Sequence, residues 1–178
     1  MIEESIRMSR RAEDMRHIFD RGFAEVRHVD ARDTCDCLSV EIAGDPYMLR
    51  LSQIVGFVAN KKVTRLPGGM PELNGIAGFR GVVMPIYDLA ALLDYPPTRS
   101  TRWTVIAADE PVGLGFDGFN GHFRFATDEI VPREGADEAD PLGHVVRSGR
   151  LALPVVSIPS IVARIRQRAA VAGSTQEH

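Results

Sequence analysis

The sequence predicts an all-β protein built as a tandem duplication, and two observations lead to this fold class. Short segments alternate apolar and polar residues with a period of two, which is the pattern of half-buried strands. Glycines and prolines also recur: adding 65, 68 or 69 to the residue number joins Pro67 to Pro132, Gly75 to Gly143, Gly81 to Gly149 and Pro85 to Pro154. Such matches constrain backbone geometry, which apolar matches do not. We therefore expect two units of about 65 residues, each containing a small sheet.

The alternation locates the strands and divides the chain into halves. Residues 38–51 alternate around a turn at Gly44-Asp45-Pro46, which predicts a hairpin. Further strands are expected in the segments that follow, up to the proline-rich turn 96–100. We therefore predict that residues 38–97 form mainly the first half and residues 102–157 mainly the second.

One helical turn is expected at residues 88–94, and longer helices are expected at the two ends of the chain. Residues 1–33 are rich in both charges and carry apolar residues at three- and four-residue steps, which predicts an amphipathic helical arm. The sequence leaves open whether this arm packs on its own domain or docks elsewhere. At the other end, Ser157 or Ser160 can cap a closing helix over residues 160–170, whose arginines favour the negative end of its dipole and are expected to be solvated.

Charge and hydropathy exclude several classes of partner. The formal net charge of -3 provides no cationic field for a phosphate backbone, so nucleic-acid binding is not expected. No apolar run approaches the roughly 18 residues of a membrane span, and residues 1–11 have no apolar core to act as a signal peptide. We therefore expect a cytoplasmic protein without direct membrane insertion.

Three motifs are reminiscent of ligand sites but favour structural explanations. Cys35 and Cys37 would share one face of a strand, and a zinc site needs about four ligands, so ordinary reduced thiols are expected. Residues 113–118 have the spacing G-x-G-x-x-G, but no helix pattern follows to receive a pyrophosphate. The acidic loop 134–140 lacks the spacing of a calcium site. We predict neither a metal nor a cofactor.

The segment GIAGFRGVVMPIYDL resembles the core motif of the CheW-like domain of bacterial chemotaxis coupling proteins. That motif reads roughly G-x-x-N-L-R-G, a short apolar strand and then P-x-x-D-L. Its characteristic residues correspond here to Gly75, Arg80, Gly81, Pro85 and Asp88. A second stretch, VGLGFDGF, is similar to a V-G-x-x-V-D-x-V stretch of the family and contributes Gly113 and Asp117. The resemblance covers about residues 36–166.

The resemblance implies both a fold and a function. Members of the family consist of two SH3-like five-stranded β-barrels packed together, so the expected CheW-like domain spans residues 34–170. They have no enzymatic activity. They couple the cytoplasmic tip of methyl-accepting chemoreceptors to the regulatory domain of a CheA-type histidine kinase. The implied location is the cytoplasm, at receptor arrays on the inner face of the membrane.

The resemblance also implies a receptor-binding groove at Ile54, Phe57 and Arg80, while the kinase-binding residues stay unassigned. Arg80 can either contact the receptor or clamp its own loop. Gly56 stands where many members carry Glu, and Phe79 stands where they carry Leu. Because the usual Glu to Arg pair cannot form, Arg80 is expected to find Asp88, a backbone carbonyl or a partner carboxylate.

Two other classes of function compete with the adapter. A small β-barrel hydrolase would use the groove between the barrels, with His122 and His144 as the candidate bases. SH3-like barrels also occur as RNA-binding modules, although these usually expose basic and aromatic surfaces.

Overall fold

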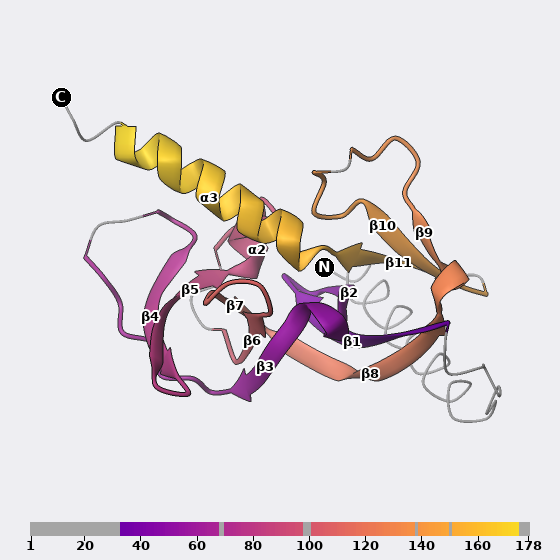
Figure 1. The fold of residues 1–178 in the computed structure, drawn as a ribbon, viewed down its shortest axis with the longest axis horizontal. Helices are drawn as coiled ribbons and strands as arrows, with labels where there is room; N and C mark the ends of the chain where they lie inside the picture. The colour runs from indigo at the N-terminus through magenta and orange to yellow at the C-terminus, as the bar shows by residue number, and fades with distance from the viewer. Residues whose placement is uncertain (1–32, 68–69, 98–100, 138, 150, 175–178) are drawn as a thin grey trace, which may run out of the picture. The chain divides into compact units, whose positions relative to one another are not determined.

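The computed structural model describes residues 33–67, 70–97, 101–137, 139–149 and 151–174 (Figure 1). The chain divides into two units between Asp33 and Thr34, and nearly all described residues belong to the second unit. The predicted N-terminal helical arm, residues 1–33, therefore lies outside the described residues except for Asp33.

The described strands form two sheets, which confirms the predicted mostly-β class. The first sheet has six strands, in the order β8 (Gly118–Ala126), β1 (Thr34–Ile42), β2 (Asp45–Arg50), β11 (Leu151–Val156), β10 (His144–Ser148) and β9 (Ile130–Pro132). The second sheet has five strands, in the order β3 (Ile54–Ala59), β6 (Trp103–Ala107), β7 (Gly113–Phe116), β5 (Val82–Asp88) and β4 (Leu73–Phe79). Outside the sheets lie the short 3-10 helices η1 (Leu51–Gln53) and η2 (Thr127–Glu129) and the α-helices α2 (Leu89–Leu92) and α3 (Ile158–Ser174).

The internal repeat inferred from residue spacing has a structural counterpart. Hairpin β4–β5 leads into α2, and hairpin β10–β11 leads into α3. The turn of each hairpin contains a glycine with positive φ, Gly81 at 82° and Gly149 at 62°. The preceding hairpins, β1–β2 and β6–β7, correspond in the same way, so both repeats share the order hairpin, strand, hairpin and helix, to which the second repeat adds β9.

The boundary between the repeats is not the boundary between the sheets. Most strands of residues 38–97, β3 to β5, lie in the second sheet, and most strands of residues 102–157, β8 to β11, lie in the first. Hairpin β1–β2 lies in the first sheet with β8 to β11, and hairpin β6–β7 lies in the second sheet with β3 to β5. Each repeat thus contributes its first hairpin to the other repeat's sheet (Figure 1). Alternation indicates which face of a strand is buried, but it does not specify the neighbouring strand.

The two edges of each sheet lie close together. In the second sheet, Thr64 follows edge strand β3 and exchanges two backbone hydrogen bonds with Ile76 of the opposite edge strand β4, with N···O distances of 2.8 and 2.9 Å. Gly75 permits this approach, since a Cβ atom there would lie 2.2 Å from the carbonyl oxygen of Thr64. In the first sheet, edge strands β8 and β9 are joined by η2, whose three residues span only about 6 Å.

The apolar core has one shared cluster and two smaller ones. The shared cluster contains residues from both sheets and both α-helices, among them Val40, Leu49, Leu89, Leu114, Phe116 and Ile161. The first sheet has its own cluster of Cys37, Met48, Val146 and Val155. The second sheet has its own cluster of Ala77, Met84, Ile86 and Ile106. Each sheet therefore buries one face by itself and contributes the other to the shared cluster.

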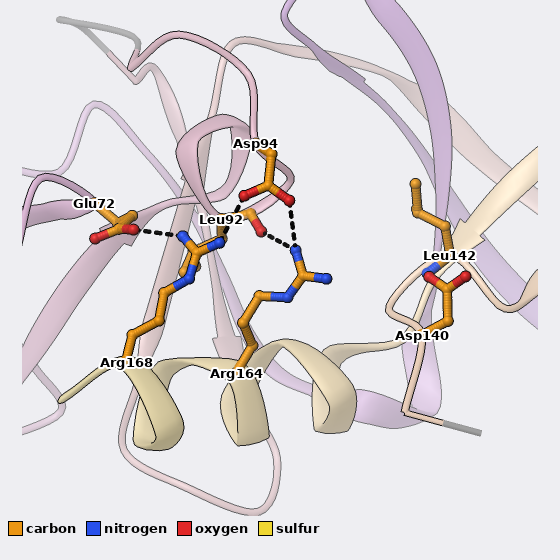
Figure 2. A network of polar contacts seen from close by, with 7 residues as sticks. All are labelled: Glu72, Leu92, Asp94, Asp140, Leu142, Arg164 and Arg168. Atoms are coloured by element: carbon orange, nitrogen blue, oxygen red, sulfur yellow. Dashed lines mark hydrogen bonds and ion pairs between the residues drawn. The ribbon is translucent and has the colours of Figure 1, made fainter. Parts of the chain in front are cut away.

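Helix α3 covers the predicted closing helix 160–170 and begins at Ile158. Ser157 just before it caps the helix, since its Oγ accepts a hydrogen bond from the Ser160 amide at 3.3 Å. The arginines of α3 are not simply solvated, contrary to the prediction. Arg164 donates to the Leu92 carbonyl at 2.8 Å and pairs with Asp94 at 3.0 Å (Figure 2). Arg168 pairs with Asp94 at 2.6 Å and with Glu72. These contacts attach α3 to the end of α2, to Asp94 after it and to Glu72 before β4.

The ion pairs of α3 predict a specific loss of stability in acid. The hydrogen bond from Arg168 holds the pKa of Asp94 below its ordinary value. A carboxylate whose pKa is lower in the folded state stabilises that state above the unfolded pKa of about 3.9. This stabilisation is lost as the pH falls through the folded pKa. We expect Asp94→Asn to cost about 0.5 to 1 kcal/mol near neutral pH, because the carboxylate is mostly exposed, and nothing below the folded pKa. Urea unfolding across this pH range tests this.

The control for that experiment is Asp109→Asn, at an exposed position in the turn between β6 and β7. It should not reproduce the pH-dependent difference. An Asp94→Asn cost that is the same at every pH would contradict the assigned ion pairs.

Candidate functional site

Arg80 lies at the tip of hairpin β4–β5 and is exposed. Arg80 and Gly81 have φ values of 48° and 82°, and Phe79 pairs with Val82. Two consecutive positive φ angles in a two-residue connection are typical of a type I′ turn, whose twist matches that of antiparallel strands. The motif glycine at position 81 therefore supports the turn that presents Arg80.

Arg80 does not pair with Asp88, which was one of the expected partners. Asp88 ends β5, six residues beyond Val82, so the two side chains are separated by about 20 Å of extended chain. Among the described residues, no ion pair or hydrogen bond is found for Arg80. Its guanidinium instead lies over the ring of Phe79, with Cζ 5.1 Å from the ring centroid.

Phe79 connects this hairpin to β3. A Cβ atom on Gly56 would lie 2.5 Å from Cζ of Phe79, so the ring occupies the space beside the glycine. β3 also carries the two other predicted groove residues, Ile54 and Phe57. The structure does not bring the three predicted residues onto one face, because Phe79 beside Arg80 packs with the second sheet's own cluster, whereas Ile54 and Phe57 pack against the shared cluster.

Ile54 and Phe57 lie where the two sheets meet. Both are half-buried against the shared core cluster. The Phe57 ring stacks on Trp103 of β6, with centroids 5.1 Å apart, and packs edge-on against Phe119 of β8 at 4.9 Å. β8 belongs to the first sheet, so these aromatic rings bridge the sheets. Trp103 and Phe119 were not identified from the sequence, because nothing local marks a pair of strands from different sheets.

Three valines are exposed on β3 and on β5, the strand that follows Arg80. Val55 is 51% exposed on β3, and Val82 and Val83 are 49% and 68% exposed on β5. A cationic side chain next to exposed valines can bind a surface that combines an acidic group with apolar side chains. This arrangement favours protein binding over chemistry on a small molecule.

Asp88 explains the P-x-x-D-L part of the motif structurally. Its carboxylate is fully buried and accepts hydrogen bonds from the backbone amides of Ala90 at 2.9 Å and Ala91 at 3.4 Å. It is therefore the N-cap of α2, and Leu89 after it is fully buried in the shared core. Pro85 lies on β5 opposite Ile76.

We expect Asp88→Ala to lower the free energy of unfolding by about 1 to 2 kcal/mol, because two buried amide groups lose their acceptor. Asp88→Asn is the matched control, since its side-chain oxygen can still cap the helix, and it should cost clearly less. Chemical denaturation of both variants provides the measurement. Equal losses would show that the charge of Asp88, and not its capping oxygen, is what matters.

Gly113 and Asp117 also lie in structural positions. Gly113 is on β7, where a Cβ atom would lie 2.4 Å from Cδ1 of Ile86. Asp117 separates β7 from β8 and accepts a hydrogen bond from the Ala43 amide at 3.3 Å. The G-x-G-x-x-G stretch is therefore followed by a strand and not by a helix, which removes the basis for a dinucleotide site.

The other candidate ligand sites do not assemble in the described residues. Cys35 and Cys37 share one face of β1 as predicted, with Sγ atoms 3.8 Å apart, and burial raises the pKa of Cys37 to about 12. No cluster of three or more potential metal ligands occurs among the described residues. His122 on β8 pairs with Asp36 at 2.9 Å. His144 lies on β10, and strands β1, β2 and β11 separate the two histidines in the sheet order.

In the part of the chain that the structure describes, no helix combines the length and the apolarity of a membrane span.

Two packed sheets that share one apolar core define a mostly-β domain. Comparison with known proteins agrees, since the CheW-like domain model matches residues 36–166. This chain belongs to the CheW-like domain family.

One relative and one solved structure are similar to this chain. The chemotaxis protein CheW of Bacillus subtilis (strain 168) is 33% identical over 106 residues, which cover 57% of this chain and 64% of the relative. The matched region therefore spans less than two thirds of that protein's length. The crystal structure of the scaffolding protein TtCheW from Thermoanaerobacter tengcongensis matches with a TM-score of 0.60 at 16% identity, covering 70% of this chain and 89% of that one. The second comparison supports the fold.

Proposed function

We propose that this protein is a chemosensory coupling adapter that links chemoreceptors to a CheA-type histidine kinase. The observation that carries the proposal is the family match over residues 36–166, which spans both sheets and the hairpin that presents Arg80. Membership of a family named for chemotaxis coupling is supported by the B. subtilis relative, whose name describes a chemotaxis protein.

The proposal includes the finer architecture of the domain. The second sheet has the five strands expected of each barrel, whereas the first has six, because β9 is added at its edge. Each sheet is taken as an SH3-like barrel, supported by the backbone bridge between Thr64 and Ile76 in the second sheet and by the short η2 connection in the first. Residues 1–33 are taken as a separate helical arm. Closed barrels suit an adapter because closure removes unpaired strand edges that would otherwise favour aggregation.

Ile54, Phe57 and Arg80 are the proposed receptor contacts. The exposed valines beside them and the free donors of Arg80 favour a receptor helix that carries both apolar residues and a carboxylate. The kinase would bind elsewhere on the domain, so that both partners can be held at once. The protein would act in the cytoplasm, at receptor arrays on the inner face of the membrane.

An adapter role is preferred to the hydrolase and the RNA-binding module. The two candidate histidines are separated by three strands, and His122 is engaged by Asp36. The formal charge of -3 disfavours binding to a phosphate backbone. A gel shift with single-stranded RNA, in which no complex is expected, tests the latter alternative.

The decisive test is reconstitution from purified components. We expect size-exclusion chromatography to recover this protein in one complex with a receptor cytoplasmic fragment and the regulatory domain of a CheA-type kinase. Each partner should also bind alone. The proposal fails if neither partner binds, and a complex with only one of them would reduce the protein to a ligand of that partner.

A further inference from the structure

We propose that Phe79 is the positioning residue of Arg80, whose guanidinium it holds at the hairpin tip in place of an internal carboxylate. Gly56 and Phe79, which both depart from the family motif, then act together, because the glycine leaves the space that the Phe79 ring fills. The functional part of this inference rests on the proposed receptor contact of Arg80.

The first step concerns how the ring of Phe79 is held. It is half-buried and packs against the second-sheet cluster of Ala77, Met84, Ile86 and Ile106. Beside it, a Cβ atom on Gly56 would meet Cζ of Phe79 at 2.5 Å and Cγ1 of Ile106 at 3.0 Å. The absence of a side chain at position 56 thus provides the space that the ring fills. Because its surroundings are packed, the ring has a defined orientation.

The second step concerns what the ring does for Arg80. The guanidinium carbon lies 5.1 Å from the ring centroid, within the roughly 6 Å range of a cation–π interaction. The turn restricts the backbone of Arg80, and the ring restricts the end of its side chain. A carboxylate could also restrain the arginine, but it would occupy N–H donors and neutralise the charge. A ring face restrains the group and leaves its donors available.

The third step follows from this difference. An arginine that is held in place without an ion pair presents its charge and its forked donors to a partner. The matching group is a carboxylate, so the receptor surface that docks here should present an aspartate or glutamate. Less side-chain freedom remains to be lost on binding, which favours affinity.

Nuclear magnetic resonance of the free protein tests whether Phe79 positions Arg80, without any receptor. The side-chain protons of Arg80 should show ring-current shifts in the wild type and in Phe79→Tyr, which keeps the ring. The shifts should disappear in Phe79→Leu, and Gly56→Ala should change them, because its methyl group displaces the ring. Wild-type shifts that do not depend on residue 79 would overturn the proposal.

Titration of a receptor cytoplasmic fragment tests the consequence. Phe79→Leu should weaken binding roughly two- to fivefold, whereas Phe79→Tyr should bind like the wild type. In an Arg80→Ala background, Phe79→Leu should have no further effect, because the ring acts through Arg80. Equal weakening in both backgrounds would overturn the positioning role. If Arg80→Ala itself binds normally, the receptor contact is wrong, and the resonance experiment still decides whether Phe79 holds Arg80.

Discussion

Gly75→Ala is expected to lower the free energy of unfolding by about 2 to 4 kcal/mol, the largest effect on stability among the substitutions considered. Gly75 has φ of 140°, a conformation that L side chains rarely adopt. A methyl group there would also lie 2.2 Å from the carbonyl oxygen of Thr64, and a backbone atom cannot yield as a flexible side chain can. The substitution therefore opposes the bridge between Thr64 and Ile76 that joins the two edges of the second sheet.

Gly78→Ala is the matched control on the same strand. Gly78 is exposed, and a Cβ atom there would meet no atom within 4 Å. We expect the free energy of unfolding of the Gly78→Ala variant to stay within about 0.5 kcal/mol of the wild-type value. Urea unfolding of the two variants measures the difference. If both behave alike, the close approach of the sheet edges at Gly75 is not important for stability.

Arg80→Asp is expected to produce the largest effect on binding. The substitution replaces a forked donor by an acceptor and leaves a partner carboxylate facing a like charge. Affinity for a receptor cytoplasmic fragment should fall by about 2 to 5 kcal/mol, and kinase binding should change much less. Asp tolerates positive φ better than most residues, so the turn should remain folded. Isothermal titration with each partner, accompanied by thermal melts, makes the measurement.

Arg147→Asp provides the control for the charge reversal. Arg147 is exposed on β10, in the hairpin that corresponds to β4–β5 in the other repeat. The Arg147→Asp variant should bind the receptor fragment with nearly wild-type affinity. Comparable losses for both variants would mean that net charge, and not the position of Arg80, controls binding. A large drop in melting temperature for Arg80→Asp alone would make Arg80 a clamp of its own loop.

The sequence by itself determined the features that depend on neighbouring residues. Alternation located the strands, because successive side chains of a strand point to opposite faces. The repeated glycines and prolines predicted the duplication, and Gly81 and Gly149 do occupy equivalent turns. Ser157 was recognised as a possible cap because capping is a local interaction. The motif around Arg80 was sufficient to identify the family that the comparisons then showed.

Only the tertiary structure decided which strands pair and which side chains meet. Each repeat exchanges its first hairpin with the other sheet, so the predicted halves do not coincide with the sheets. Phe79 meets Gly56 from the opposite edge of a sheet, and the α3 arginines find Asp94 some seventy residues earlier, with separations of 70 and 74. These contacts depend on how the strands pair and how the elements pack. Pairing and packing are collective results of burying both sheets in one shared core, which no local spacing encodes.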